Sequence, residues 1–173
     1  MRILRALGCT LAVVLAPSAG FSQQELVPTD TLIRLERTRC FGTCPAYSVT
    51  IDARGTVSFD GTWGVRVTGR QVASIDPRLV SGILEAAERI HFYDLRDRYT
   101  MDVTDLPTTF VTITSGGRTK RVEDYIGPPD GLRELEEQID NAARRHWSPN
   151  EYWSFCGNSS VSSKIRSAKS MAF

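Results

Sequence analysis

The chain has 173 residues, with 21 basic and 20 acidic side chains and a formal net charge of +1. This balance argues against a general nucleic-acid-binding protein, which would show a basic excess. The length is sufficient for one domain with its own hydrophobic core.

The first 22 residues have the order typical of a secretory signal peptide. Two arginines, Arg2 and Arg5, precede a mostly apolar run over residues 7–16, and small residues follow at 17–22. The apolar run is shorter than the roughly 20 residues that span a bilayer. We therefore expect residues 1–22 to be removed and the mature protein to be exported, to the periplasm or the extracellular space. No other stretch reaches membrane-spanning length.

The first half of the remaining chain predicts strands and then a helix. Residues 31–37 alternate apolar and polar side chains, as a half-buried strand does. Residues 47–52 and 56–60, joined by a turn, predict a hairpin, and residues 65–67 predict another short strand. A helix is expected from Pro77 to about residue 90, because Asp76 can cap its free amides and apolar residues then recur at helical spacing.

The second half repeats this order after a polar loop. The loop holds Asp94, Asp97, Asp102 and Asp105, and clustered carboxylates can bind Ca²⁺. Their spacing fits no EF-hand and arginines lie among them, so a solvated loop is the preferred interpretation. Residues 109–114 and 118–125 predict a second hairpin, and an apolar stripe over residues 132–143 predicts a second helix.

The element order is strand, hairpin, helix, then hairpin, helix, which suggests a degenerate duplication of a ββα unit. It predicts an α+β fold in which one antiparallel sheet carries two helices on one face. We place this single domain at residues 30–147. Residues 148–173 are rich in serine and have no apolar period, so we expect a flexible tail, which contains Cys156.

Cys40 and Cys44, followed by Pro45, allow three interpretations. An exported protein meets an oxidising compartment, so a structural disulfide is favoured, and Gly42 lets the short loop turn. A redox centre is less favoured, because a thioredoxin-type motif has two intervening residues and starts a helix. A strand is expected to follow Pro45 instead.

The third interpretation of the pair is a copper site. The pattern resembles the copper-binding motif of the Sco chaperones, in which soft thiolates suit Cu(I) and a distant histidine is the third ligand. His91 and His146 are the two histidines of the chain. Both fall in or beside predicted helices, where a packed histidine is the simpler interpretation, and the βαβ order of the Sco family is lacking. Zinc would need four ligands, which the spacings do not supply.

Four short motifs resemble those of an uncharacterised family of exported bacterial domains of unknown function, over about residues 32–143. The resemblance implies a bacterial exported protein and no particular mechanism. In chain order the motifs are Arg37-x-x-Cys40-Phe41-Gly42-x-Cys44-Pro45-x-Tyr47-x-Val49, Gly55-Thr56-Val57, Asp105-x-Pro107-Thr108 and Asp124-Tyr125.

Polar residues at strand ends can line a pocket, which makes Tyr47, Asp105, Asp124 and Tyr125 candidate ligand-pocket residues. For Tyr125, anchoring of the proline-rich turn that follows it is the favoured alternative. No nucleophile elbow, His-Glu-x-x-His motif or phosphate loop occurs, which favours a non-catalytic role over a carboxylate-based hydrolase.

We therefore expect an exported, non-catalytic domain, with no cofactor, that binds a protein or small-molecule partner in the cell envelope. The alternative is a periplasmic copper-binding or thiol-redox protein that uses Cys40 and Cys44.

Overall fold

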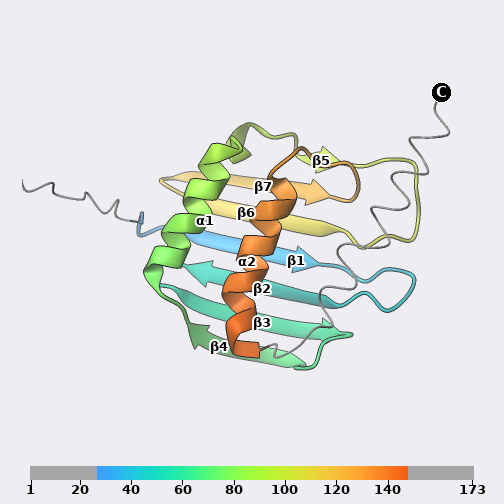
Figure 1. The fold of residues 1–173 in the computed structure, drawn as a ribbon, viewed down its shortest axis with the longest axis horizontal. Helices are drawn as coiled ribbons and strands as arrows, with labels where there is room; N and C mark the ends of the chain where they lie inside the picture. Colours follow the sequence, from blue (N-terminus) through green and yellow to red (C-terminus); the bar gives the residue numbers. More distant parts are fainter. Residues whose placement is uncertain (1–26, 148–173) are drawn as a thin grey trace, which may run out of the picture.

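The computed structural model describes residues 27–147. The predicted signal peptide and the predicted tail, with Cys156, lie outside the described residues. Within them the chain forms seven strands, two α-helices and one short 3₁₀-helix (Figure 1). In chain order these are β1 (Leu32–Arg37), β2 (Ala46–Asp52), β3 (Thr56–Trp63), β4 (Gly69–Ser74), α1 (Pro77–Arg89), η1 (Phe92–Asp94), β5 (Arg98–Tyr99), β6 (Thr109–Ser115), β7 (Arg118–Asp124) and α2 (Leu132–Trp147).

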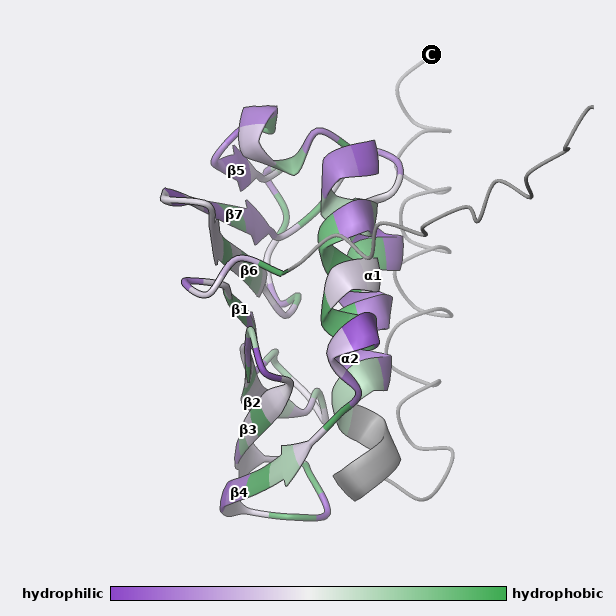
Figure 2. Cartoon of the chain, turned by 90° about the vertical axis from the view of Figure 1, so that its left-hand side faces the viewer, coloured by the Kyte–Doolittle hydropathy of each residue, from purple (hydrophilic) through white to green (hydrophobic). Residues whose placement is uncertain are grey.

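All seven strands form one sheet in the order β4-β3-β2-β1-β6-β7-β5. Neighbouring strands are antiparallel, except that β5 pairs with β7 in parallel. Both helices cross the same face of the sheet, as the side view in Figure 2 shows. The predicted α+β fold, an antiparallel sheet with two helices on one face, is therefore confirmed. No helix within residues 27–147 is long and apolar enough to cross a membrane.

The core lies between this face and the helices. The alternation predicted for β1 holds, with Ile33 and Leu35 fully buried. The apolar stripes of both helices cover the strands, because residues three and four apart share one side of a helix. In α1 the stripe is Val80, Ile83, Ala86 and Ala87, and in α2 it is Leu132, Leu135, Ile139, Ala142 and Ala143.

Several local predictions are confirmed and others are wrong. Asp76 caps α1 through a hydrogen bond that its carboxylate accepts from the Arg78 N–H, at 2.9 Å. The strand predicted at residues 65–67 does not form; those residues turn the chain between β3 and β4. Gly64 and Gly69 both adopt positive φ, which brackets the turn and delays β4 to residue 69. β5 was not predicted, since it consists of two residues inside the polar loop.

The two central hairpins, β2–β3 and β6–β7, flank β1. Along the chain the first is followed by β4 and then α1, and the second is followed directly by α2. β4 and β5 form the outer edges of the sheet. The six-residue β4 pairs antiparallel with β3, whereas the two-residue β5 pairs parallel with β7. The internal duplication of a ββα unit stays a prediction.

Candidate functional site

On the face of the sheet that carries the helices, a row of polar side chains lies at the end where β1 leads into the loop toward β2. The strand register places Arg37 opposite Tyr47 on one side and opposite Thr109 on the other, and Thr109 opposite Asp124. The preceding row on the same face is apolar and buried, with Leu35 in β1. In four adjacent strands, β2, β1, β6 and β7, the buried side chains on this face therefore change from apolar to polar at the same register position.

Helix α2 supplies the partners for this row. Glu136 and Asp140 lie four residues apart on α2, so both project toward the sheet, and each is 2% exposed. The Asp140 carboxylate accepts hydrogen bonds from Arg37 Nη2 at 2.8 Å and Nε at 3.1 Å, and from the Tyr47 hydroxyl at 2.6 Å. Arg37 Nη1 also donates to Thr109 Oγ1 at 2.9 Å. One guanidinium thus joins three strands to a helix.

The Arg37 guanidinium stays protonated in the folded protein. Burial by itself would lower its pKa, but the carboxylate of Asp140 and the other acidic groups around it raise the pKa above the ordinary value. The side chain keeps 24% of its surface exposed, so the network reaches solvent on one side. Removing either partner of such a pair leaves a buried charge without compensation, which typically costs about 3–5 kcal/mol.

Asp124 and Glu136 form a second, proton-sharing part of the cluster. Burial and the neighbouring Asp124 carboxylate raise the pKa of Glu136 to about 8, against the opposing effect of Arg37. Burial also raises the pKa of Asp124. Asp124 Oδ1 and Glu136 Oε1 are buried, and neither accepts a hydrogen bond from any other group in the described part of the chain. We infer that the two carboxyl groups share one proton at neutral pH, because each raised pKa favours the protonated form and a shared proton supplies the missing donor.

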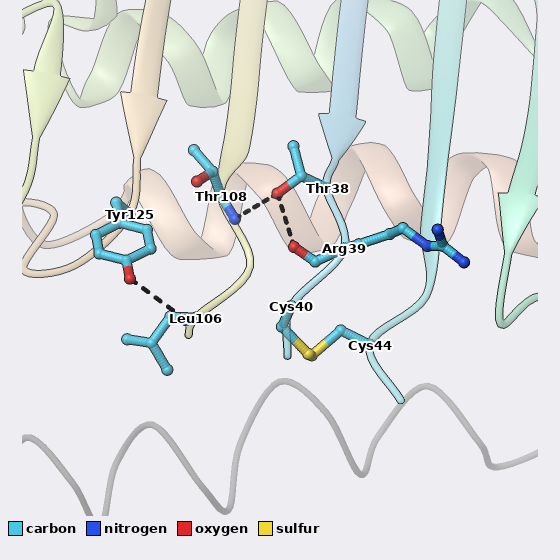
Figure 3. The surroundings of a disulfide bond; sticks show 7 residues. All are labelled: Thr38, Arg39, Cys40, Cys44, Leu106, Thr108 and Tyr125. Atoms are coloured by element: carbon cyan, nitrogen blue, oxygen red, sulfur yellow. Dashed lines mark hydrogen bonds between the residues drawn. A yellow bond between two sulfur atoms is a disulfide. The ribbon is translucent and has the colours of Figure 1, made fainter. Parts of the chain in front are cut away.

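Above the polar row, a disulfide between Cys40 and Cys44 closes the loop over residues 38–45 (Figure 3). Gly42 lies inside this ring, and its N–H donates to the Cys40 carbonyl at 2.9 Å. The loop is also hydrogen-bonded to the segment that precedes β6. The Thr108 N–H donates to Thr38 Oγ1 at 2.8 Å, and the Thr38 N–H donates to the Thr108 carbonyl at 2.9 Å. The loop is therefore fixed at its base and within its turn. We call residues 38–45 the stapled loop.

The stapled loop carries exposed aromatic and cationic groups. Phe41, inside the disulfide ring, is 91% exposed. The Arg39 guanidinium lies 3.8 Å from the centre of the Trp63 ring, and Trp63, at the end of β3, is 49% exposed. Gly64, with φ of +62°, packs so closely on the loop that an added Cβ would lie 3.3 Å from Pro45 Cα. The end of β3 and the stapled loop thus form one continuous surface.

The structure separates the four candidate pocket residues into two groups. Tyr47 and Asp124 lie in the same row of the sheet, with Arg37 and Thr109 between them. Asp105 is exposed in the loop before β6, and its carboxylate accepts a hydrogen bond from Thr104 at 3.1 Å.

Tyr125 holds that same loop in place. Within residues 27–147, no hydrogen bond joins its side chain to the polar row. Its hydroxyl donates to the Val103 carbonyl at 2.7 Å. It also accepts from the Leu106 N–H at 3.3 Å, the bond drawn in Figure 3. The tyrosine thus anchors residues 103–106, which precede β6. Pocket formation by the four residues together stays a prediction.

Sequence reasoning missed most of the polar cluster. Arg37 continues the alternation of Ile33 and Leu35, so a charge on the buried face was a readable signal. Glu136 and Asp140 are spaced by one helical turn beside the apolar stripe of α2, which was a second signal. Neither signal identifies its partner, because Arg37 and Asp140 are 103 residues apart in sequence.

The metal alternatives find little support among the residues that the structure describes. Cys40 and Cys44 are joined, so neither sulfur is a thiolate, the form that binds Cu(I). His91 is exposed at the start of η1, and the His146 side chain lies outside the described part of the chain. Within residues 27–147 no group of three or more His, Cys, Asp or Glu side chains has a geometry that could hold a metal ion. Asp97, from the acidic loop, pairs instead with Lys120 at 2.6 Å.

Comparison with known proteins identifies a family for most of the described chain. A family model described as a domain of unknown function (DUF6438) matches residues 31–143. The match therefore includes the stapled loop, the whole sheet from the last residue before β1 onward, and the acidic residues of α2. No curated protein matches the chain.

Proposed function

This chain belongs to the DUF6438 family, and we propose that it is an exported binding module that docks a protein partner through the stapled loop. The exposure of Phe41 carries the proposal. A phenylalanine that is 91% exposed leaves most of its surface in water, although burying such a side chain is worth about 1.5–3 kcal/mol. Because the ring lies inside a five-residue disulfide ring, it is presented in a restricted position.

Restriction of the loop favours binding, because fewer conformations are lost when a partner immobilises it. The disulfide limits the turn, and the two Thr38–Thr108 hydrogen bonds fix the loop against the neighbouring segment. Beneath it, the Arg37–Asp140 pair fixes the end of β1 on α2. The disulfide, the Thr38–Thr108 hydrogen bonds and the ion pair beneath the loop together restrict its conformation, so it can present a fixed surface to a partner.

The neighbouring side chains are of the types that dominate binding interfaces. Tryptophan and arginine are enriched among residues whose removal weakens protein complexes most. Trp63 and Arg39 already stack on each other beside the loop, so little reorganisation is needed on binding. The expected partner is a protein with an apolar pocket for Phe41 and an acidic or aromatic rim for Arg39.

The proposed location of this binding is outside the cytoplasm. A disulfide persists in oxidising compartments, and the first 22 residues have the order of a signal peptide. The two observations are independent, since one concerns the N-terminus and the other the folded domain.

The proposal is tested by placing a photo-crosslinking phenylalanine analogue at position 41 in exporting cells. We expect a covalent adduct of one defined mass from position 41 and none from position 72. Val72 is the matched control, because it is also an exposed apolar residue, at 64%, but lies on the edge strand β4. The adduct must also weaken when Arg39→Ala is introduced beside the analogue. Equal labelling from both positions, or no adduct, would overturn the proposal.

A further inference from the structure

A cavity of about 500 Å³ lies at the opposite end of the strands from the stapled loop. Its position follows from the register, because β1 begins there and β6 ends there, with Leu32 opposite Thr114. Its walls are α1, η1, the β6–β7 turn and residues 27–28, and Figure 1 shows α1 and this turn on the side of the sheet away from the β1–β2 loop. Pockets for small molecules have volumes of about 300–1,000 Å³.

The cavity has an apolar interior and a charge-balanced rim. Val27 and Leu84 contribute apolar surface from two different segments, together with the ring of Tyr93. The rim carries two acidic and two basic side chains, so it offers no net attraction for a charged ligand. These are Glu85, Glu88, Arg89 and Arg118. Arg118 is already engaged, since it pairs with Glu88 at 3.3 Å and lies 4.1 Å from the centre of the Tyr93 ring.

One donor in this cavity wall lacks an acceptor. The Tyr93 hydroxyl is buried and has no hydrogen-bond partner among residues 27–147. A buried polar group left in this state costs about 1–3 kcal/mol, and most such groups in proteins have a partner. Burial raises the pKa of Tyr93, so the hydroxyl stays protonated and remains a donor at physiological pH.

The wall that faces Tyr93 is held in place independently of any ligand. The Asp30 carboxylate accepts hydrogen bonds from the N–H groups of Gly116 at 3.0 Å and Gly117 at 2.7 Å. The hydroxyls of Thr31 and Ser115 are also bonded to each other, at 3.0 Å. The β6–β7 turn is thus fixed by its own contacts and keeps the cavity formed.

We propose that this cavity binds a small, uncharged amphipathic molecule, whose apolar body lies against Val27 and Leu84 and whose carbonyl or hydroxyl oxygen accepts a hydrogen bond from Tyr93 once a small rotation of that side chain turns its buried hydroxyl toward the cavity. The balanced rim excludes a strong preference for an anion or a cation. The unpaired hydroxyl selects an oxygen acceptor over a pure hydrocarbon, because only an acceptor removes the cost of the buried donor. This site is separate from the protein-docking surface and does not depend on it.

The test uses PRODAN, an uncharged naphthalene dye with one ketone oxygen, titrated into the purified protein. We expect saturable binding with a blue-shifted emission and weaker binding of the anionic dye anilinonaphthalene sulfonate. Tyr93→Phe should weaken PRODAN binding about 5- to 10-fold while the melting temperature stays the same or rises, because the variant removes an unsatisfied polar group. Tyr125→Phe, the same change in the loop beside β7, should leave dye binding unchanged.

A second variant separates a binding defect from a folding defect. Ser81→Phe adds a ring to the cavity wall from α1, and it should abolish PRODAN binding with an unchanged circular dichroism spectrum. The proposal is overturned if PRODAN does not saturate, or if it binds the wild type and Tyr93→Phe equally. It is also overturned if the mature protein, without residues 1–22, binds the dye only after residues 23–26 are removed as well, because that segment would then be the occupant.

Discussion

Replacing Glu136 with glutamine tests the proton that we infer between Glu136 on α2 and Asp124 on β7. In the folded protein the pKa of Glu136 is raised to about 8, compared with 4.5 for an ordinary glutamate. The folded state therefore holds a proton that the unfolded chain releases between these two values. Its contribution to stability is fully present below pH 4.5 and is lost as the pH rises through about 8.

The magnitude follows from the number of protons involved. One extra proton in the folded state makes the free energy of unfolding fall by about 1.4 kcal/mol per pH unit within this window. The substituted glutamine would be neutral at every pH, and its amide could donate to Asp124 in place of the shared proton. Relative to the wild type, Glu136→Gln should therefore gain about 1.4 kcal/mol per pH unit between about pH 5.5 and 7.5.

The assay is urea unfolding followed by tryptophan fluorescence at four pH values from 5 to 8, with the disulfide intact. The quantity compared is the difference in unfolding free energy between variant and wild type, which cancels the titration of groups that do not interact with Glu136. Glu137→Gln is the matched control, because Glu137 is the next residue of α2 but exposed. If the Glu136→Gln difference is as flat with pH as the Glu137→Gln difference, the shared proton does not exist.

Two further predictions concern the same end of the sheet. Tyr47→Phe removes the 2.6 Å hydrogen bond to the Asp140 carboxylate and should lower the free energy of unfolding by about 1.5–3 kcal/mol, while Tyr125→Phe should cost less; equal losses in urea unfolding would contradict this. Mass spectrometry of the exported protein without reductant should find Cys40 and Cys44 joined, and reduction should cost about 2 kcal/mol because the closed loop is short. Two free thiols in that sample, with stoichiometric Cu(I) uptake lost in Cys44→Ser, would instead support the copper alternative.

The elements that could be predicted from the sequence are those whose signal is local. Alternation placed β1, and a capping aspartate before a proline placed the start of α1, because each pattern depends on a few adjacent residues. The strand predicted at residues 65–67 is wrong because that prediction also used only a few adjacent residues. Two valines alternate there, but the glycines at 64 and 69 set the turn, and only the pairing of β3 with β4 decides where the next strand starts.

The candidate site was less predictable, because it is assembled by pairing across the sheet. Tyr47 and Asp124 were selected separately as strand-end residues, and the register shows why they share a row. Their connection runs through Arg37, whose position on the buried face was visible but whose partner on α2 was not. A contact between residues more than one hundred positions apart leaves no periodic trace in a single sequence.

The composition of the polar row fits a positioning role better than a stabilising one. Buried ion pairs are weak contributors to stability, and well-packed apolar residues of similar volume often do as well or better. Apolar contacts, however, have no direction, whereas the Arg37 guanidinium donates along fixed axes to acceptors on β2, β6 and α2. Replacing the Arg37–Asp140 pair by methionine and leucine, together with Tyr47→Phe so that the Tyr47 hydroxyl is not left without its acceptor, should therefore preserve or raise the melting temperature yet loosen the stapled loop. Faster hydrogen exchange at residues 38–45 in such a stable variant would assign the network to holding Phe41 in place, and unchanged exchange would assign it to the core.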